Sequence, residues 1–205
     1  DIFNDINLII REGDFFFITG SSGAGKTTFL KLLSSSLRPT GGNISFNNQN
    51  LNKIAQNKLH IVKRQIGFVF QDFRLLPHLT TYENVALPLK VQNKKEKNYK
   101  KDVIELLSWV NLEHCTHSYP NHLSGGEQQR AAIARAVIPS PRIILADEPT
   151  GNVDHENSKK ILKLFSEMNK LGTTIIIATH DEGLLSHSGA RVIEIENSGI
   201  KIKER

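Results

Sequence analysis

One short segment limits the possible folds of this chain more than any other: an apolar run, a glycine-rich loop and an amphipathic helix follow one another directly. The run "DFFFITG" (14–20) is apolar on both faces, which is typical of a strand buried in a parallel sheet. The loop "GSSGAGKT" (20–27) fits G-x-x-x-x-G-K-[ST] and stands between a strand and a helix, as that pattern requires. The helix, "KTTFLKLLSSSL" (26–37), is expected to bury Phe29, Leu32, Leu33 and Leu37.

The loop has the chemistry to hold a nucleoside triphosphate together with Mg²⁺. Its glycines let backbone N–H groups wrap a phosphate, Lys26 brings positive charge to the β- and γ-phosphates, and the hydroxyl of Thr27 can bind the metal. The candidate nucleotide-binding residues are Gly20, Ser21, Ser22, Gly23, Ala24, Gly25, Lys26, Thr27 and Thr28.

A second apolar run supplies the other half of such a site. The expected strand "IILADE" (143–148) carries Asp147 to its carboxyl end, where ligands bind in parallel sheets. Asp147 can bind Mg²⁺ through water, whereas Glu148 points elsewhere and can polarise an attacking water. Together with the glycine-rich loop, this strand predicts a P-loop nucleoside triphosphatase.

The order of the apolar segments predicts an α/β fold. We expect a P-loop NTPase core, a mostly parallel sheet flanked by helices, with an antiparallel β subdomain and an inserted α-helical subdomain. Further core strands are expected at 65–71, 173–180 and 190–202, the last with an Asn-Ser-Gly hairpin turn. Strands of the antiparallel part are expected at 9–14 and 41–49. The chain is therefore interpreted as one domain, with a core of 1–71 and 141–205 around a helical segment, 72–140.

Helical periodicity predicts two further buried stripes. The stripe in the helical segment consists of Val103, Leu106, Leu107 and Val110. The stripe between the later strands consists of Ile161, Leu164, Phe165, Met168 and Leu171.

The stretch "LSGGEQQR" (123–130) predicts a second phosphate-binding helix start. Ser124 followed three residues later by Glu127 is a capping box, so a helix should begin here. Gly125 and Gly126 leave the backbone N–H groups of its first turn uncovered, which suits an anion. One γ-phosphate needs only one such cradle, so the second one serves another ligand or the nucleotide of another copy.

Five segments in this order resemble the motifs of ABC ATPases and span nearly the whole chain. "LSGGEQQRAAIARA" resembles the signature motif, Gln71 the Q-loop, "GNVD" (151–154) the D-loop and His180 the switch histidine, beside the P-loop. The resemblance implies a head-to-tail homodimer in the ATP-bound state, with the signature of one copy closing over the ATP of the other. The implied signature residues are Ser124, Gly125, Gly126, Glu127 and Gln128.

The same resemblance implies a role for each remaining site residue. Glu148 would activate water, His180 would contact the γ-phosphate, and Gln71 would sense Mg²⁺ and link the site to the helical segment. The implied metal residues are Thr27, Gln71 and Asp147, and Asp154 would act in the D-loop. ABC ATPases usually stack adenine on an aromatic residue upstream of the first strands. Phe3 fits a core position better, so the stacking residue is expected in a segment before Asp1.

Composition and charge limit the classes of partner and the cellular compartment expected for this chain. The net charge is +5, but the densest basic stretch, 90–101, contains a single aromatic residue, so a solvated surface is favoured over a specific nucleic-acid site. No run approaches 18 apolar residues, so no helix is expected to span a membrane by itself. The single cysteine, Cys115, excludes an intrachain disulfide and favours a reducing compartment. Two other classes of protein are disfavoured. A chromosome-handling ABC ATPase would need a long coiled coil, and the segment 72–140 is too short to contain one. A P-loop kinase that phosphorylates a small molecule would have no use for the signature motif.

The segment 71–89, "QDFRLLPHLTTYENVALPL", and "ADEPTGNVD" resemble one branch of the family, which contains FtsE, LolD and MacB. "FQDFRLL" and "ATHD" resemble FtsE most. An FtsE-like role implies a cytoplasmic subunit, peripheral on the inner face of the bacterial plasma membrane. It also implies an FtsX-like integral membrane partner in cell division, docked near the Q-loop and the helical segment. The alternative within the branch is a LolD- or MacB-like lipoprotein-release or efflux transporter.

Overall fold

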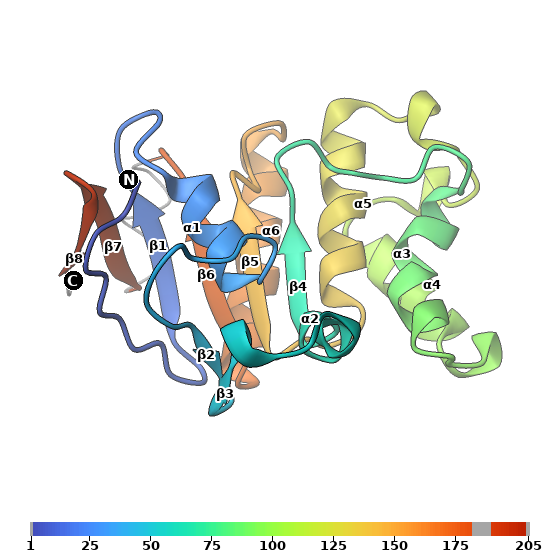
Figure 1. Cartoon of the computed structure of the whole chain (residues 1–205). Helices are drawn as coiled ribbons and strands as arrows, with labels where there is room; N and C mark the ends of the chain where they lie inside the picture. Colours follow the sequence, from blue (N-terminus) through green and yellow to red (C-terminus); the bar gives the residue numbers. More distant parts are fainter. Residues whose placement is uncertain (1, 182–189, 204–205) are drawn as a thin grey trace.

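The computed structural model describes residues 2–181 and 190–203. A six-stranded sheet in the order β4-β5-β6-β1-β7-β8 forms its centre (Figure 1). The strands are β1 (Phe15–Thr19), β4 (Ile66–Val69), β5 (Ile143–Asp147), β6 (Thr174–Ala178), β7 (Arg191–Glu196) and β8 (Gly199–Lys203). All neighbours are parallel except β7 and β8, which form an antiparallel hairpin. The predicted α/β class with a mostly parallel sheet is therefore confirmed.

Helices cover both faces of the sheet because alternate side chains of its strands point to opposite sides. Phe16 and Ile18 pack in one apolar cluster with α1 (Lys26–Leu33). Phe17 packs in another with α5 (Gly125–Val137) and α6 (His155–Lys170). Strands β5 and β6 are buried at every position, and Phe16, Phe17 and Ile18 of β1 are buried, as the apolar run 14–20 predicted.

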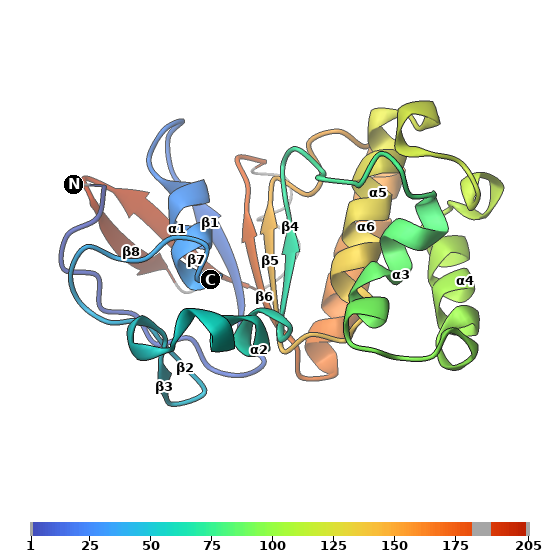
Figure 2. The same ribbon diagram turned by 45° about the vertical axis from the view of Figure 1, so that its right-hand side comes forward.

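The segment between β4 and β5 contains no strand and forms a helical group beside the sheet (Figure 2). Its helices α3 (Thr81–Val91), α4 (Lys100–Trp109) and α5 enclose a separate core that includes Val85, Val103 and Leu107. Helix α5 belongs to both cores, since Ala131 and Ala134 face the helical group whereas Ile133 and Val137 face the sheet. Helix α5 therefore joins the helical group to the sheet.

Short elements complete the chain. They are β2 (Ser45–Phe46), β3 (Gln49–Asn50), α2 (Leu59–Lys63) and the 3-10 turns η1 (Leu51–Lys53), η2 (Gln56–Lys58), η3 (Glu96–Asn98), η4 (Glu113–Cys115) and η5 (Pro120–His122). Strands β2 and β3 are antiparallel, so the prediction for 41–49 is partly confirmed. In the β7–β8 hairpin, Asn197 and Ser198 both have positive φ, at 49° and 63°, as its two-residue turn requires.

Three sequence expectations were wrong. Segment 9–14 is not a strand, because a tight turn closes there with the N–H of Asp14 donating to the carbonyl of Arg11. Helix α1 ends at Leu33, not at residue 37, and Leu37 is exposed. Leu171 lies beyond the end of α6 and is 88% exposed, so it is not part of the buried stripe.

Serine chemistry explains the early end of α1. Ser35 is left-handed, with φ at 53°, and the N–H groups of Ser35 and Ser36 donate to the carbonyls of Leu32 and Lys31. This is a Schellman ending. The Ser34 hydroxyl also donates to the carbonyl of Lys31 at 3.1 Å, and such bonds compete with helix continuation.

Candidate nucleotide site

The glycine-rich loop joins the carboxyl end of β1 to the start of α1, as its sequence predicted. Gly20 and Gly25 have φ of 149° and 106°, which L side chains rarely adopt. A Cβ on Gly20 would also lie 2.7 Å from the carbonyl oxygen of Ile195. These glycines are therefore required by the conformation and packing of the chain itself. Between and after them lie Ser21, Ser22, Gly23, Ala24 and Thr28.

Lys26 and Thr27, the first two residues of α1, turn toward the loop and toward β5. The ammonium of Lys26 donates to the carbonyls of Gly20 and Ser21, at 2.9 and 3.2 Å. The Thr27 hydroxyl donates to Oδ2 of Asp147 at 2.7 Å. The structure thus brings together two residues 120 positions apart that the sequence assigned to one metal site.

The Thr27–Asp147 pair fits Mg²⁺ by its chemistry. Both groups offer oxygen, the ligand atom this hard cation prefers. Asp147 is 4% exposed, and burial raises the pKa of its carboxyl against the opposing hydrogen bond from Thr27. A buried carboxylate whose charged form is disfavoured gains most from a nearby cation.

Glu148 and His180 meet at the same edge of the sheet. Glu148 follows β5 directly and has a left-handed φ of 50°. Its Oε1 accepts from Nδ1 of His180 at 2.9 Å, and this bond and the carboxylate charge raise the pKa of His180. The two residues lie 32 positions apart and meet because β5 and β6 are neighbours.

Gln71 follows β4 at this edge and is exposed. The segment after it is attached to helix α5 by Arg135. The guanidinium of Arg135 donates to the carbonyls of Phe73 and Arg74 at 2.7 and 2.6 Å. Burial lowers the pKa of Arg135, and the two carbonyls replace water as partners of a guanidinium that is half-buried. No sequence pattern predicted this link between the Q-loop segment and α5.

The predicted capping box opens helix α5. Ser124 is its N-cap, its hydroxyl accepts from the N–H of Glu127 at 3.3 Å, and Oε2 of Glu127 accepts from the N–H of Ser124 at 2.8 Å. Oε1 of Glu127 accepts from Nε2 of His114 at 2.8 Å. Hydrogen bonds from His114 and then from Ser124 lower the pKa of Glu127 to about 2. The side chain of Gln128 bonds back to the carbonyl of Leu123.

The first turn of α5 lies against the D-loop of its own chain. A Cβ on Gly126 would lie 3.2 Å from the carbonyl oxygen of Asn152, whereas a Cβ on Gly125 would meet nothing within 4 Å. Asp154 caps α6, with its Oδ1 accepting from the N–H of Asn157 at 2.9 Å. The same interaction lowers the pKa of Asp154.

The two glycine-rich helix starts lie apart. Both are at the end of the molecule where the parallel strands have their carboxyl ends, but α1 lies over the sheet and α5 beyond β4 (Figure 1). The strand next to α5, β4, is three places from β1 in the sheet, a distance of about 14 Å at the usual strand spacing. No hydrogen bond or ion pair joins residues 20–28 to residues 123–128.

Comparisons with known proteins agree with this architecture. A model of the ABC transporter family matches residues 3–151. The cell division ATP-binding protein FtsE of Bacillus subtilis is 43% identical over 98% of this chain and 88% of its own length. FtsE of Escherichia coli K12 is 42% identical over 92% of this chain and 85% of its own length.

Solved structures show the same fold. The dimeric post-hydrolysis structure of the ATP-binding cassette MJ0796, bound to ADP and Pi, has a TM-score of 0.93 and 37% identity. The match covers 99% of this chain and 90% of that one. Within the described part of this chain, no helix is both long and apolar enough to cross a membrane. The match to the family model over most of the chain, the FtsE relatives and the shared fold show that the chain belongs to the ABC transporter family, as an ATP-hydrolysing ATP-binding cassette.

Proposed function

We propose that two copies of this chain trap ATP head to tail, each nucleotide held between the P-loop of one copy and the signature of the other. The separation of the two helix starts within one chain carries this proposal, because one γ-phosphate cannot touch both. Gly125 supports it, since its missing side chain leaves open space that no described residue of its own chain fills. The dimeric cassettes among the solved neighbours are consistent with it.

The described contacts support roles at this edge of the sheet for Lys26, Thr27, Asp147, Glu148 and His180. When ATP binds, the ammonium of Lys26 leaves the carbonyls of Gly20 and Ser21 and contacts the β- and γ-phosphates. Thr27, Asp147 and Gln71 would hold Mg²⁺ together with the phosphates. When bound, the metal offsets the phosphate charge. Gly20 to Thr28 supply the backbone and hydroxyl contacts to the phosphates.

Glu148 is the proposed general base. Its Oε1 is held by His180, which leaves Oε2 to accept the proton of the attacking water. A protonated His180 is a donor that can contact the γ-phosphate, and the raised pKa of His180 favours that form. In the other copy, Ser124 and the N–H groups of Gly125 and Gly126 face the γ-phosphate at the positive end of α5. Glu127 and Gln128 hold this turn, and Asp154 holds the D-loop beside it.

The relatives support a more specific role. We infer an FtsE-like subunit, with residues 72–140 as a helical subdomain within a single cassette domain. It acts in cell division at the inner face of the bacterial plasma membrane, with an FtsX-like integral membrane partner. The partner docks near Gln71 and the helical group. Arg135 supports this arrangement because its hydrogen bonds tie the Q-loop segment to α5.

Mixing two inactive variants tests the composite site. Ser124→Arg with Gly125→Asp fills the proposed γ-phosphate seat but leaves the P-loop untouched. Lys26→Ala removes a charge-assisted phosphate contact and should weaken ATP binding itself. Each variant alone should be inactive. Their mixture contains heterodimers in which one of the two sites joins an intact P-loop to an intact signature, so hydrolysis should return in part.

Binding measurements on the separate variants complete the test. The signature variant should bind ATP as a monomer with nearly the affinity of the unchanged chain, whereas Lys26→Ala should not. Loss of monomer ATP binding in the signature variant would mean that the signature acts within its own chain. Co-purification with an FtsX-like protein, measured with and without ATP, tests the membrane role separately.

A further inference from the structure

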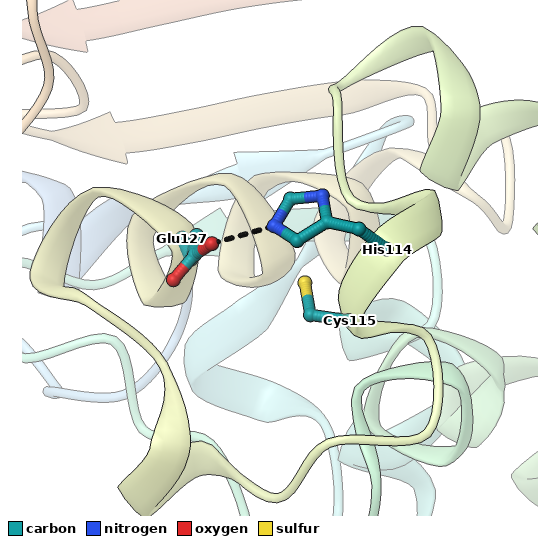
Figure 3. Close-up of side chains that lie close together, drawn as sticks. All are labelled: His114, Cys115 and Glu127. Carbon is teal, nitrogen blue, oxygen red and sulfur yellow. Dashed lines mark hydrogen bonds and ion pairs between the residues drawn. The ribbon is translucent and has the colours of Figure 1, made fainter.

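Three side chains of metal-binding type meet beside the start of α5, away from the P-loop. His114 and Cys115 belong to η4, Glu127 belongs to α5, and one ligand atom of each lies within 4.8 Å of the others. Figure 3 shows the thiol, the imidazole and the carboxylate converging from these two elements. Across residues 2–181 and 190–203 no other such group of His, Cys, Asp and Glu occurs. We propose that His114, Cys115 and Glu127 form a zinc-binding site.

The spacing of the donor atoms suits a tetrahedral ion. Zinc bonds to S, N and O of about 2.0–2.3 Å place neighbouring ligand atoms of a tetrahedral site about 3.3–3.6 Å apart. The atoms of the cluster lie within 4.8 Å of one another, and the His114–Glu127 pair at 2.8 Å. Zinc would replace the hydrogen bond between His114 and Glu127 and the 3.4 Å bond from the Cys115 thiol to the carbonyl of Leu112.

The charges favour a divalent cation with affinity for sulfur. A thiolate on Cys115 and the carboxylate of Glu127 together balance the charge of Zn²⁺, and His114 contributes a neutral nitrogen. Sulfur and imidazole nitrogen select zinc over Mg²⁺, which prefers oxygen. The ion of this cluster is therefore distinct from the one proposed at Thr27 and Asp147.

Zinc must displace the proton of the Cys115 thiol. Burial, and then the charge of Glu127, raise the pKa of this thiol; Arg130 lowers it and Glu113 raises it. Binding therefore releases a proton and strengthens as pH rises. Without the ion, the buried thiol is an unreactive group.

The surroundings orient the ligands. The N–H and the hydroxyl of Ser124 both donate to Oε2 of Glu127 at 2.8 Å, which leaves Oε1 directed at the cluster. Cys115 is 5% exposed, and the side chain of His114 is 61% exposed. The three protein ligands thus leave a fourth position that water can reach. The bound ion would tie η4 to the first turn of α5.

Cobalt substitution tests the site without ATP, so its outcome does not depend on the proposed ATPase cycle. The chain is titrated with Co²⁺ in the presence of excess Mg²⁺, and Zn²⁺ is then added as competitor. We expect one cobalt per chain, a tetrahedral visible spectrum and a sulfur-to-cobalt charge-transfer band that zinc abolishes. Cys115 is the only cysteine of the chain, so the band in the unchanged protein already identifies the ligand.

Matched histidine variants locate the site. His114→Gln should weaken cobalt binding at least about tenfold, since even loss of a metal site's outer partners costs about 10–100-fold. His117→Gln changes an exposed histidine outside the cluster and should bind as the unchanged chain does. Cys115→Ser should lose the charge-transfer band. A folded chain without that band, or equal affinities for the two histidine variants, would overturn the proposal.

Discussion

The two glycine-rich helix starts, at α1 and α5, are similar in sequence and different in structure. At α1 the N-cap is Gly25, which is left-handed and forms no side-chain cap. At α5 the N-cap is Ser124, with an extended backbone and a complete capping box. The first start depends on backbone conformation, and the second depends on side chains.

The glycines differ in the same way. Gly20 and Gly25 have positive φ, and a Cβ on either would collide with the chain itself. Gly125 has no positive φ, and a Cβ there would meet open space. The folded chain thus explains the P-loop glycines but not Gly125. A ligand or second copy that approaches this backbone closely would explain it.

The largest effect is expected at the edge of the sheet beside the P-loop, because the proposed hydrolysis takes place there and not at the start of α5. Glu148→Gln should reduce turnover about 10²–10⁴-fold, because the carboxylate is the proposed base. ATP binding should persist, and an ATP-bound dimer should accumulate on size-exclusion chromatography. Glu156→Gln, on the exposed first turn of α6, is the control and should retain turnover. A monomeric Glu148→Gln chain that hydrolyses ATP at the normal rate would contradict the assignment.

A pair of alanine substitutions tests the glycines directly. Gly25→Ala should destabilise the chain by about 1–2 kcal/mol or more, because alanine is strained at this φ and would meet Ile2 and Phe3. Gly125→Ala should leave the monomer as stable or stabilise it by about 0.4–1 kcal/mol, since alanine restricts the unfolded chain.

Thermal unfolding of both variants, with ATP-dependent dimerisation measured alongside, decides between the two explanations. Gly125→Ala should weaken dimerisation despite its intact monomer. If it dimerises and hydrolyses ATP normally, the space beside Gly125 is not where the second copy's phosphate lies.

The smallest effect concerns the pair at the edge of the sheet. In Glu148→Gln the pKa of His180 should fall toward its ordinary value of about 6.5, because the hydrogen bond to an ionised carboxylate and the charge of that carboxylate, which both raise it, are gone. In the unchanged chain the Glu148–His180 pairing contributes fully to the free energy of unfolding at pH values below that ordinary pKa. This contribution is lost as pH rises through the raised pKa of His180. NMR titration of the histidine ring protons measures this. A shift shared by all the histidines would point to a general structural change instead.

Much of the fold follows from local patterns. Continuous apolar runs identified the five predicted core strand segments, and the Ser124–Glu127 spacing identified the start of α5, since these signals involve neighbouring residues. The errors were also local. Three consecutive serines ended α1 early, and the turn at 11–14 replaced an expected strand. Apolar periodicity does not register such competing backbone hydrogen bonds.

The sequence by itself determined which groups this protein has: a P-loop, an acidic strand end, a capped signature helix and a histidine after a strand. Only the tertiary structure decided which of them meet. Strand order brings Glu148 to His180 and Thr27 to Asp147, while it keeps the P-loop and the signature apart. The Arg135 link and the His114–Cys115–Glu127 cluster likewise appear only in the folded chain. The physical reason is that helix and turn signals act over three or four residues, whereas these contacts depend on how distant elements pack.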